Sequence, residues 1–360
     1  MTETSLPRTD QGALPTVEPR RGWKQLILAL IAMFFVPAFA LRAMLPIDET
    51  LLLFVPAMAA CALVGWWAGG RASMAIAWVA LAIAVAGPRV ATGDVFSTLV
   101  HGWTLLLAGV FGLTCLLAGQ RPFFTKALLA LVATFAVALV MGLVGPVTLS
   151  HASQAVAEEF SRRNDDALAV LNATIAQNAA QWKEMTTRFP SLATFPADAA
   201  KNLSTLSAAG RVAFPALLSL ESLAALALAW ATYHRLSRRR LGAPLAPLRE
   251  FRFNDQLVWG LIIGLVILLL PNLSGIRGLG INLIVFFGAL YAVRGLAVLA
   301  WFMRPGALAV SFVVGFVMLL APFLSVFAVL GFLTLGITAL GLGVGDTWAD
   351  WRGRARSTLS

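Results

Sequence analysis

Cysteine and histidine are scarce in this 360-residue chain, which contains two cysteines and three histidines. Cys61 and Cys115 lie in apolar runs, where they offer no disulfide framework and behave as small hydrophobes. His101, His151 and His234 are far apart in the sequence, which argues against a histidine-rich metal site. The motifs His-Glu-x-x-His and Gly-x-Ser-x-Gly are absent. We therefore expect no metal, no cofactor and no enzymatic activity; a membrane-embedded enzyme would need a nucleophile or metal cluster that the sequence does not show.

Charged residues are also few, at 12% of the chain, whereas hydrophobic residues make up 59% and the mean hydropathy is +0.83. Soluble domains carry about twice that share of charge, and a bilayer-crossing helix needs about 20 mostly apolar residues. Ten apolar blocks meet or approach this length, so we predict an all-α, polytopic transmembrane helix bundle of about 8–10 spans. The blocks cover residues 25–44, 51–68, 72–87, 96–118, 125–147, 212–234, 257–271, 279–303, 307–321 and 323–342.

Three of these blocks, the third, seventh and ninth, are short, so each could lie partly buried or re-enter the membrane. The last two meet at Ala321-Pro322. Because proline in a helix interior removes a backbone hydrogen bond, we predict a hairpin there, with one long kinked helix as the alternative. Ala38-Phe39-Ala40 fits a signal-peptide cleavage pattern, but the long charged region before it favours a retained first span.

The basic residues alternate between the two sides of the bundle and predict its orientation. Lys and Arg are in excess in cytoplasmic loops, which places both termini in the cytoplasm and leaves Arg42, Arg89 and Arg277 on short outer loops. A net charge of +10 would suggest nucleic-acid binding in a soluble protein. Here we expect the basic residues to set the topology and to contact anionic lipid headgroups, and we expect no nucleic-acid binding. The abundance of Arg and Ala is typical of bacteria, and we predict a multi-pass protein of the bacterial cytoplasmic membrane. The predicted cytoplasmic residues are Arg8, Arg20, Arg21, Lys24, Arg71, Arg121, Lys126, Arg235, Arg238, Arg239, Arg240, Arg249, Arg252, Arg304, Arg352, Arg354 and Arg356.

The same pattern divides the chain into five parts. Residues 1–24 form a polar tail that we expect to be disordered, and residues 25–147 form an N-terminal half with five spans. An extracytoplasmic helical hairpin over 148–211 follows. The C-terminal half of the bundle covers 212–342, and residues 343–360 form a cytoplasmic tail.

The hairpin is predicted from two apolar stripes at helical spacing, separated by Pro190, which disfavours helix at the residue before it. The arms could continue the flanking spans outward. The stripes could zip the arms together, form a lid or sensor over an outer cavity, or make a dimer surface. The charged pairs Glu158-Glu159, Arg162-Arg163 and Asp165-Asp166 indicate a solvated face. The stripe residues are Leu168, Leu171, Ile175, Asn178, Trp182, Met185 and Phe189, then Leu192, Phe195, Ala199, Leu203 and Leu206.

Four polar residues fall within or beside predicted spans: His101, Glu221, Asn282 and Arg294. Ionised groups in hydrocarbon are costly and usually face a partner or a water-filled cavity. Glu221 and Arg294 could form a buried pair that fixes helix packing, or could line a solute or proton path. Arg294 could also reach the cytoplasmic headgroups, and His101 is most simply a polar cap near the interface.

The C-terminal third resembles a known family. The segments Gly280–Ala297 and Gly341–Arg352, with Leu248–Arg252 before them, are similar to the YybS-like family of bacterial membrane proteins over about 245–353. Members usually carry Gln where Arg294 stands. The resemblance implies a distant likeness to the substrate-binding membrane components of energy-coupling-factor transporters, which have no ATPase of their own. Their Ala-xxx-Ala docking pattern is not found in the first span of this chain.

A second group of candidates, Asp346, Trp348, Asp350, Trp351 and Arg352, lies near the end of the last span. Tryptophan prefers the headgroup layer, so this group could be an interfacial anchor or a docking patch for a cytoplasmic protein partner. We expect a transport-type component that binds a small solute without its own ATPase. The alternative is a membrane scaffold or envelope sensor that acts through its hairpin and protein partners. A polar cavity reaching Glu221 or Arg294 would favour the transporter.

Overall fold

The computed structural model describes residues 23–36, 45–47, 49–87, 94–119, 121–145, 148–303, 306–320 and 325–357. Within these ranges all regular secondary structure is helical, which confirms the predicted all-α class. Most of the predicted disordered tail, the Ala38-Phe39-Ala40 pattern and the Ala321-Pro322 junction lie outside the described residues.

Each of the ten predicted blocks contains a helix. In the described part of the chain, six helical segments are long and apolar enough to cross a membrane, by length and composition: those within or around α2, α4, α5, α8, α10 and α12. α3 and α9 are apolar but shorter, as their blocks predicted. The helices of the blocks are α1 (Trp23–Val36), α2 (Thr50–Trp67), α3 (Ala72–Ala86), α4 (Val95–Leu117), α5 (Phe123–Val144), α8 (Phe195–Leu236), α9 (Val258–Leu269), α10 (Arg277–Phe302), α11 (Ala307–Leu320) and α12 (Ser325–Ala349).

The remaining helices lie between or after these. α6 and α7 belong to the predicted hairpin, and α13 follows α12 at the C-terminal side. Short 3-10 turns connect the others. Their bounds are α6 (Leu149–Gln177), α7 (Ala179–Arg188), η3 (Pro190–Thr194), η4 (Leu248–Glu250), η5 (Asp255–Leu257), η6 (Pro271–Ile276) and α13 (Trp351–Ser357).

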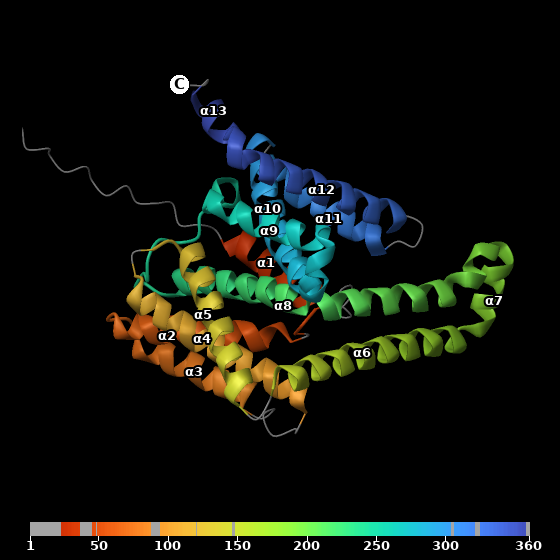
Figure 1. The fold of residues 1–360 in the computed structure, drawn as a ribbon, viewed down its shortest axis with the longest axis horizontal. Coiled ribbons are helices and arrows are strands. Elements are labelled where there is room, and N and C mark those ends of the chain that lie inside the picture. The colour runs from red at the N-terminus through yellow and green to blue at the C-terminus, as the bar shows by residue number, and fades with distance from the viewer. Residues whose placement is uncertain are drawn as a thin grey trace, which may run out of the picture.

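The 42-residue helix α8 organises the bundle (Figure 1). On one side it packs against α2 and α5, and on the other against α10, which in turn packs against α9 and α12. Trp230 of α8 is fully buried and meets the rings of Phe111 and Phe123 from α4 and α5. Two groups of helices, α1–α5 and α9–α12, thereby meet at α8.

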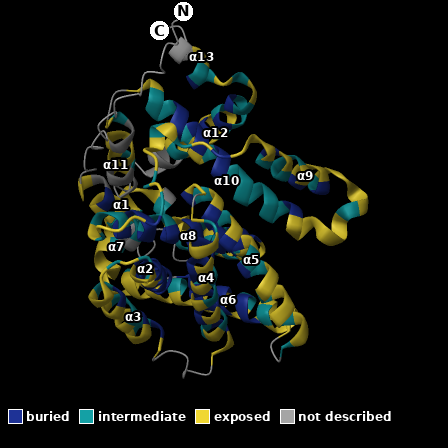
Figure 2. Cartoon of the chain, turned by 90° about the vertical axis from the view of Figure 1, so that its left-hand side faces the viewer, coloured by how far each residue is buried: buried dark blue, intermediate teal, exposed yellow. Residues whose placement is uncertain are grey.

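Burial within the bundle follows a membrane pattern. α2 is buried along most of its length, whereas outward faces of α3 and α9 are exposed (Figure 2). Many large apolar side chains remain exposed, among them Trp67, Leu117, Val144 and Leu269. Apolar surface of this extent is rare on soluble monomers and is the surface that lipid would cover.

The hairpin is present as two long helices, α6 and the first part of α8, joined by α7 and η3 (Figure 1). We call this feature the arm, its side of the bundle the arm end, and the other side the opposite end. α8 runs without interruption from the arm into the bundle, whereas α5 and α6 are separate helices. The first stripe is not one helix as predicted: α6 ends at Gln177, and the Nδ2 of the next residue, Asn178, donates to the carbonyl of Thr174 at 2.8 Å. Short amide side chains favour such local bonds over helix continuation.

The last two blocks form separate helices, α11 and α12, that pack against each other. The hairpin interpretation is therefore confirmed over the single kinked helix. α12 continues to Ala349, seven residues beyond the predicted end of the span at 342.

Candidate functional site

A buried ion cluster lies at the opposite end of the bundle. Arg294 of α10 donates from Nε to Oδ2 of Asp346 on α12 at 3.1 Å, and from Nη1 to Oδ1 of Asp255 at 2.5 Å. The same Asp346 oxygen accepts a hydrogen bond from Nη2 of Arg352 at 2.7 Å. Arg294, Asp346 and Arg352 are each at most 2% exposed. These four residues, the Arg294 cluster, unite three predicted candidates with Asp255, which sequence reasoning did not single out.

The cluster balances two guanidinium groups against two carboxylates. Burying an unpaired charge is strongly unfavourable. The two buried arginines share the buried Asp346, and Asp255, which is 59% exposed, supplies the second carboxylate from the surface. Arg352 also donates from Nη1 to the carbonyls of Arg249 and Phe251, at 3.0 and 3.1 Å. The guanidinium carbon of Arg294 lies 5.5 Å from the ring centroid of Phe253. The cluster thus fastens the loop between α8 and α9 to α10 and α12.

Two glycines bring α10 and α12 together beside the cluster. A Cβ atom on Gly295 would lie 1.7 Å from the carbonyl oxygen of Ala339, and one on Gly343 would lie 1.8 Å from that of Tyr291. Any side chain at these positions would collide with backbone, so the helices can approach only because both residues are glycine.

The other C-terminal candidates lie at the surface. Asp350, in the left-handed region with φ 39°, separates α12 from α13, and its carboxylate pairs with Arg252. The hydrogen bond from the Arg252 guanidinium holds the pKa of Asp350 below its usual value. Trp348 is 66% exposed. Trp351 is half-buried, and its ring packs on Gly345, where a Cβ atom would collide with it. The predicted group therefore divides into buried Asp346 and Arg352 and the more exposed Trp348, Asp350 and Trp351.

Glu221 lies near the arm end and does not pair with Arg294, whose ion-pair partners are Asp255 and Asp346. Instead, its Oε2 accepts a hydrogen bond from the backbone N–H of Ile47 at 3.2 Å. Glu221 is 8% exposed. The carboxylate holds the segment before α2 against α8, which is a packing role.

A second ion pair holds the same segment before α2 in place. Nε of Arg163 lies 2.7 Å from Oε1 of Glu159, four residues earlier on α6, and both side chains are buried. Nη1 of Arg163 donates to the carbonyl of Leu45 at 2.6 Å, and Nη2 to that of Pro46 at 3.4 Å. The expectation of a solvated face is wrong for Glu159 and Arg163, because one face of α6 packs on the bundle, with Arg163 over the ring of Phe96.

Asn282 bridges two backbone groups of α8. Its Oδ1 accepts from the N–H of Ala216 at 2.8 Å, and its Nδ2 donates to the carbonyl of Val212 at 2.8 Å. These two groups are four residues apart, the spacing of a helical hydrogen bond, and Pro215 lies between them. A side chain inserted in the helical ladder beside a proline is a known cause of helix distortion. Asn282 therefore stabilises α8 at Pro215 and joins it to α10.

His101 is buried in α4, at 3% exposure, about two turns from the start of the helix. Its Nδ1 donates to the carbonyl of Ser97 at 2.7 Å. The four intramembrane candidates thus lie at separate places, and each bonds to backbone or to ion partners rather than forming one polar path.

A large cavity opens between α4, α5, α6 and α8 at the arm end, with a volume of about 1360 Å³. Its deeper wall is formed by Trp103, Leu106, Phe135 and Leu218. The Trp103 indole N–H is already used, since it donates to Oγ of Ser222 at 3.0 Å. The lining is predominantly apolar and includes none of the four intramembrane candidates.

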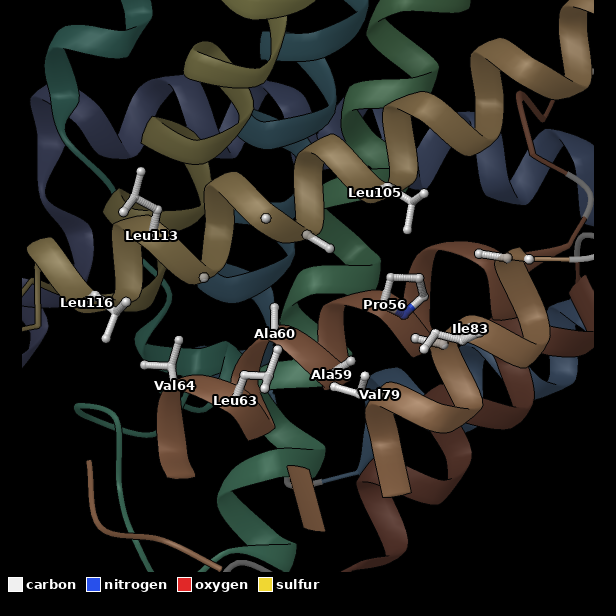
Figure 3. Close-up of a pocket in the computed structure, with 16 residues that line it drawn as sticks. Pro56, Ala59, Ala60, Leu63, Val64, Val79, Ile83, Leu105, Leu113 and Leu116 are labelled. Carbon is white, nitrogen blue, oxygen red and sulfur yellow. The ribbon is translucent and has the colours of Figure 1, made fainter. Parts of the chain in front are cut away.

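A smaller groove of about 620 Å³ lies between α2, α3 and α4 (Figure 3). It is lined by small residues such as Ala60 and Gly109 and by the larger, exposed side chains of Leu63, Ile83 and Leu105. It too is apolar. Neither cavity is the polar cavity that a transporter of a polar solute would need at Glu221 or Arg294.

Sequence reasoning missed Asp255, the Glu159–Arg163 pair and the large cavity. The i,i+4 spacing of Glu159 and Arg163 beside the apolar Phe160 was an available signal for a half-buried pair. Asp255 lies in a loop whose distance from Arg294 depends on tertiary structure alone. Among the described residues, no group of three or more His, Cys, Asp or Glu side chains could hold a metal ion.

Comparison with protein families identifies one match. The family described as "Predicted membrane protein (DUF2232)" matches residues 26–338, and the chain belongs to this family. The match extends well before residue 245, where the sequence resemblance began. No curated protein and no solved structure matches the chain.

Proposed function

Taking this family membership as the premise, we propose that the protein is a transport-type, solute-binding membrane component without its own ATPase, and that its solute is apolar or amphipathic. The observation that supports this is the cavity of about 1360 Å³ between α4, α5, α6 and α8. It is larger than typical small-molecule sites, which occupy roughly 300–1,000 Å³. Its apolar lining favours hydrocarbon chains over a polar metabolite.

The buried charges support an apolar solute indirectly. Arg294 and Arg163 are each held by carboxylates and backbone carbonyls. Groups engaged in this way fix helices and are not available to bind a polar solute without losing those bonds. The resemblance to energy-coupling-factor components leads to a further part of this proposal. The protein would capture its solute in the membrane, and a partner protein would drive the movement of the solute.

The binding step is tested with dansyl-undecanoic acid added to the detergent-purified protein. Gly102 lines the large cavity and Gly109 lines the smaller groove, both on α4, and an added Cβ meets no atom within 4 Å at either position. We expect Gly102→Phe to weaken probe binding at least tenfold (about 1.4 kcal/mol), whereas Gly109→Phe leaves it unchanged. Equal binding by both variants would contradict the assignment of the cavity.

We also propose the predicted orientation, with the opposite end in the cytoplasm of a bacterium. Lys126 donates to the carbonyl of Leu241 at 3.1 Å, and Arg352 to that of Arg249, so several of the basic residues gather at one end. A Cys61→Ala/Cys115→Ala background with Lys201→Cys or Arg240→Cys tests this with an impermeant maleimide on intact cells. We expect labelling at Lys201→Cys only; labelling at Arg240→Cys only would invert the topology.

The alternative, a scaffold or envelope sensor, is favoured by the tip of the arm. Met185, Phe189 and Phe195 are each about half exposed there, at 45%, 46% and 45%. The Phe195 ring packs on the ring of Trp182 from α7, with centroids 6.2 Å apart. The exposed parts of the three side chains form an apolar surface that a protein partner would cover. If Phe189→Ser/Phe195→Ser abolishes cellular function while probe binding is retained, the scaffold or sensor function is the better account.

A further inference from the structure

Arg211 is a cation at the edge of the large cavity. Arg211 lies on α8 where the arm meets the apolar part of the helix, and it is exposed. Among the described residues, no carboxylate forms an ion pair with it. Arg163, which is buried at the arm end, has such a partner in Glu159. Arg211 thus carries an unbalanced positive charge beside an apolar cavity.

The lining of the cavity is graded along its length. Its polar side chains, Thr98, Thr148, Ser153 and Arg211, all lie at the arm end of the bundle. The deeper residues, such as Leu106 on α4 and Leu218 on α8, are apolar. A cavity with one polar, cationic end and one apolar end matches an amphipathic molecule lying in the same direction, with its headgroup at the arm end.

From this grading and from the charge of Arg211, we infer that the cavity binds an anionic phospholipid, with the phosphate against Arg211 and the acyl chains between α4, α5 and α8. The inference rests on the proposed function and names its ligand class. A guanidinium donates to phosphate oxygens in a bidentate geometry. Among the described residues, Arg211 is the one charged side chain that lines the cavity, so a net-negative headgroup is complemented better than a zwitterionic one.

The test is lipid retention from an equimolar mixture of phosphatidylglycerol and phosphatidylcholine with identical acyl chains. The full-length protein is incubated with the mixture, washed in detergent and analysed by mass spectrometry of the extracted lipids. We expect wild type to retain phosphatidylglycerol about fivefold over phosphatidylcholine, the preference that one partly exposed ion pair supplies. Arg211→Gln should retain both lipids with a ratio near one.

Two controls separate the causes. Arg277→Gln removes an exposed arginine that lies near the arm end of α10 and does not line the cavity, and should keep the fivefold preference. Gly102→Phe should reduce retention of both lipids together. The melting temperature of each variant shows whether it is folded.

The outcomes distinguish the two levels of the proposal. In one outcome, Gly102→Phe displaces the retained lipid, but wild type shows no preference for phosphatidylglycerol or Arg211→Gln keeps the same preference. That outcome would overturn the anionic headgroup and leave the cavity assignment intact. Retention that Gly102→Phe does not affect would overturn the cavity assignment itself. Loss of the preference in Arg211→Gln alone supports the inference.

Discussion

Arg294 of α10 and Asp346 of α12 form a buried ion pair, with Nε and Oδ2 3.1 Å apart and both side chains at most 3% exposed. Asp346 also pairs with Arg352, so one carboxylate serves two guanidinium groups. The packing of the C-terminal helices therefore depends on this residue more than on any exposed charge nearby.

Removal of this carboxylate should be costly. Asp346→Asn leaves two buried arginines with less compensation, and we expect the free energy of unfolding to fall by about 3–5 kcal/mol. Asp350→Asn, four residues later, removes an exposed pair with Arg252 and should cost at most about 1 kcal/mol. Denaturant titration of both variants in detergent checks this; similar losses would show that burial of the cluster contributes little.

The crossing of α10 and α12 should tolerate no side chain at Gly295. Gly295→Ala places a methyl group against the carbonyl of Ala339 and should force the helices apart, lowering the melting temperature by several degrees or preventing folding. Gly288→Ala on the same helix meets no atom within 4 Å and should be neutral or slightly stabilising. A stable Gly295→Ala protein would mean that α10 and α12 are further apart than the structure shows.

Loss of the Asn282 amide should loosen α8 at Pro215. Asn282→Leu leaves the N–H of Ala216 and the carbonyl of Val212 without that partner, and we expect a loss of about 1–3 kcal/mol. Hydrogen exchange at Ala216 should become faster. Asn272→Leu, at an exposed position of η6, serves as the control. If exchange at Ala216 is unchanged, the bridge does not stabilise α8.

The arm should be divisible into a dispensable and a required part. Its buried side chains, such as Glu159, Phe160 and Arg163, lie near the bundle, whereas α7 has none. Replacing residues 168–203 by a short linker should leave the melting temperature within a few degrees of wild type. Replacing 153–208 removes the hydrogen bonds from Arg163 to the carbonyls of Leu45 and Pro46 and should destabilise the protein markedly. Equal stability of the two deletions would contradict a structural role for Arg163.

The apolar blocks predicted the helices well because a stretch of about 20 apolar residues has few alternatives to a membrane helix. The ends were less predictable: α12 passes Gly343 and continues to Ala349, since close packing on α10 supports a glycine-rich segment that local propensity disfavours. Ile47, the partner of Glu221, and Asp255, a partner of Arg294, could not be predicted. Both partners lie in connecting segments whose position depends on tertiary packing. The cavity arises where four helices diverge, and no local pattern indicates such a space.

The most direct test of the proposed function is a native mass spectrum of the gently purified protein beside the Gly102→Phe variant. We predict that wild type carries one bound lipid-like mass, that Gly102→Phe has lost it, and that Gly109→Phe retains it. A bare wild-type chain, a bound mass that Gly102→Phe also retains, or a protein partner in place of the lipid would contradict the account.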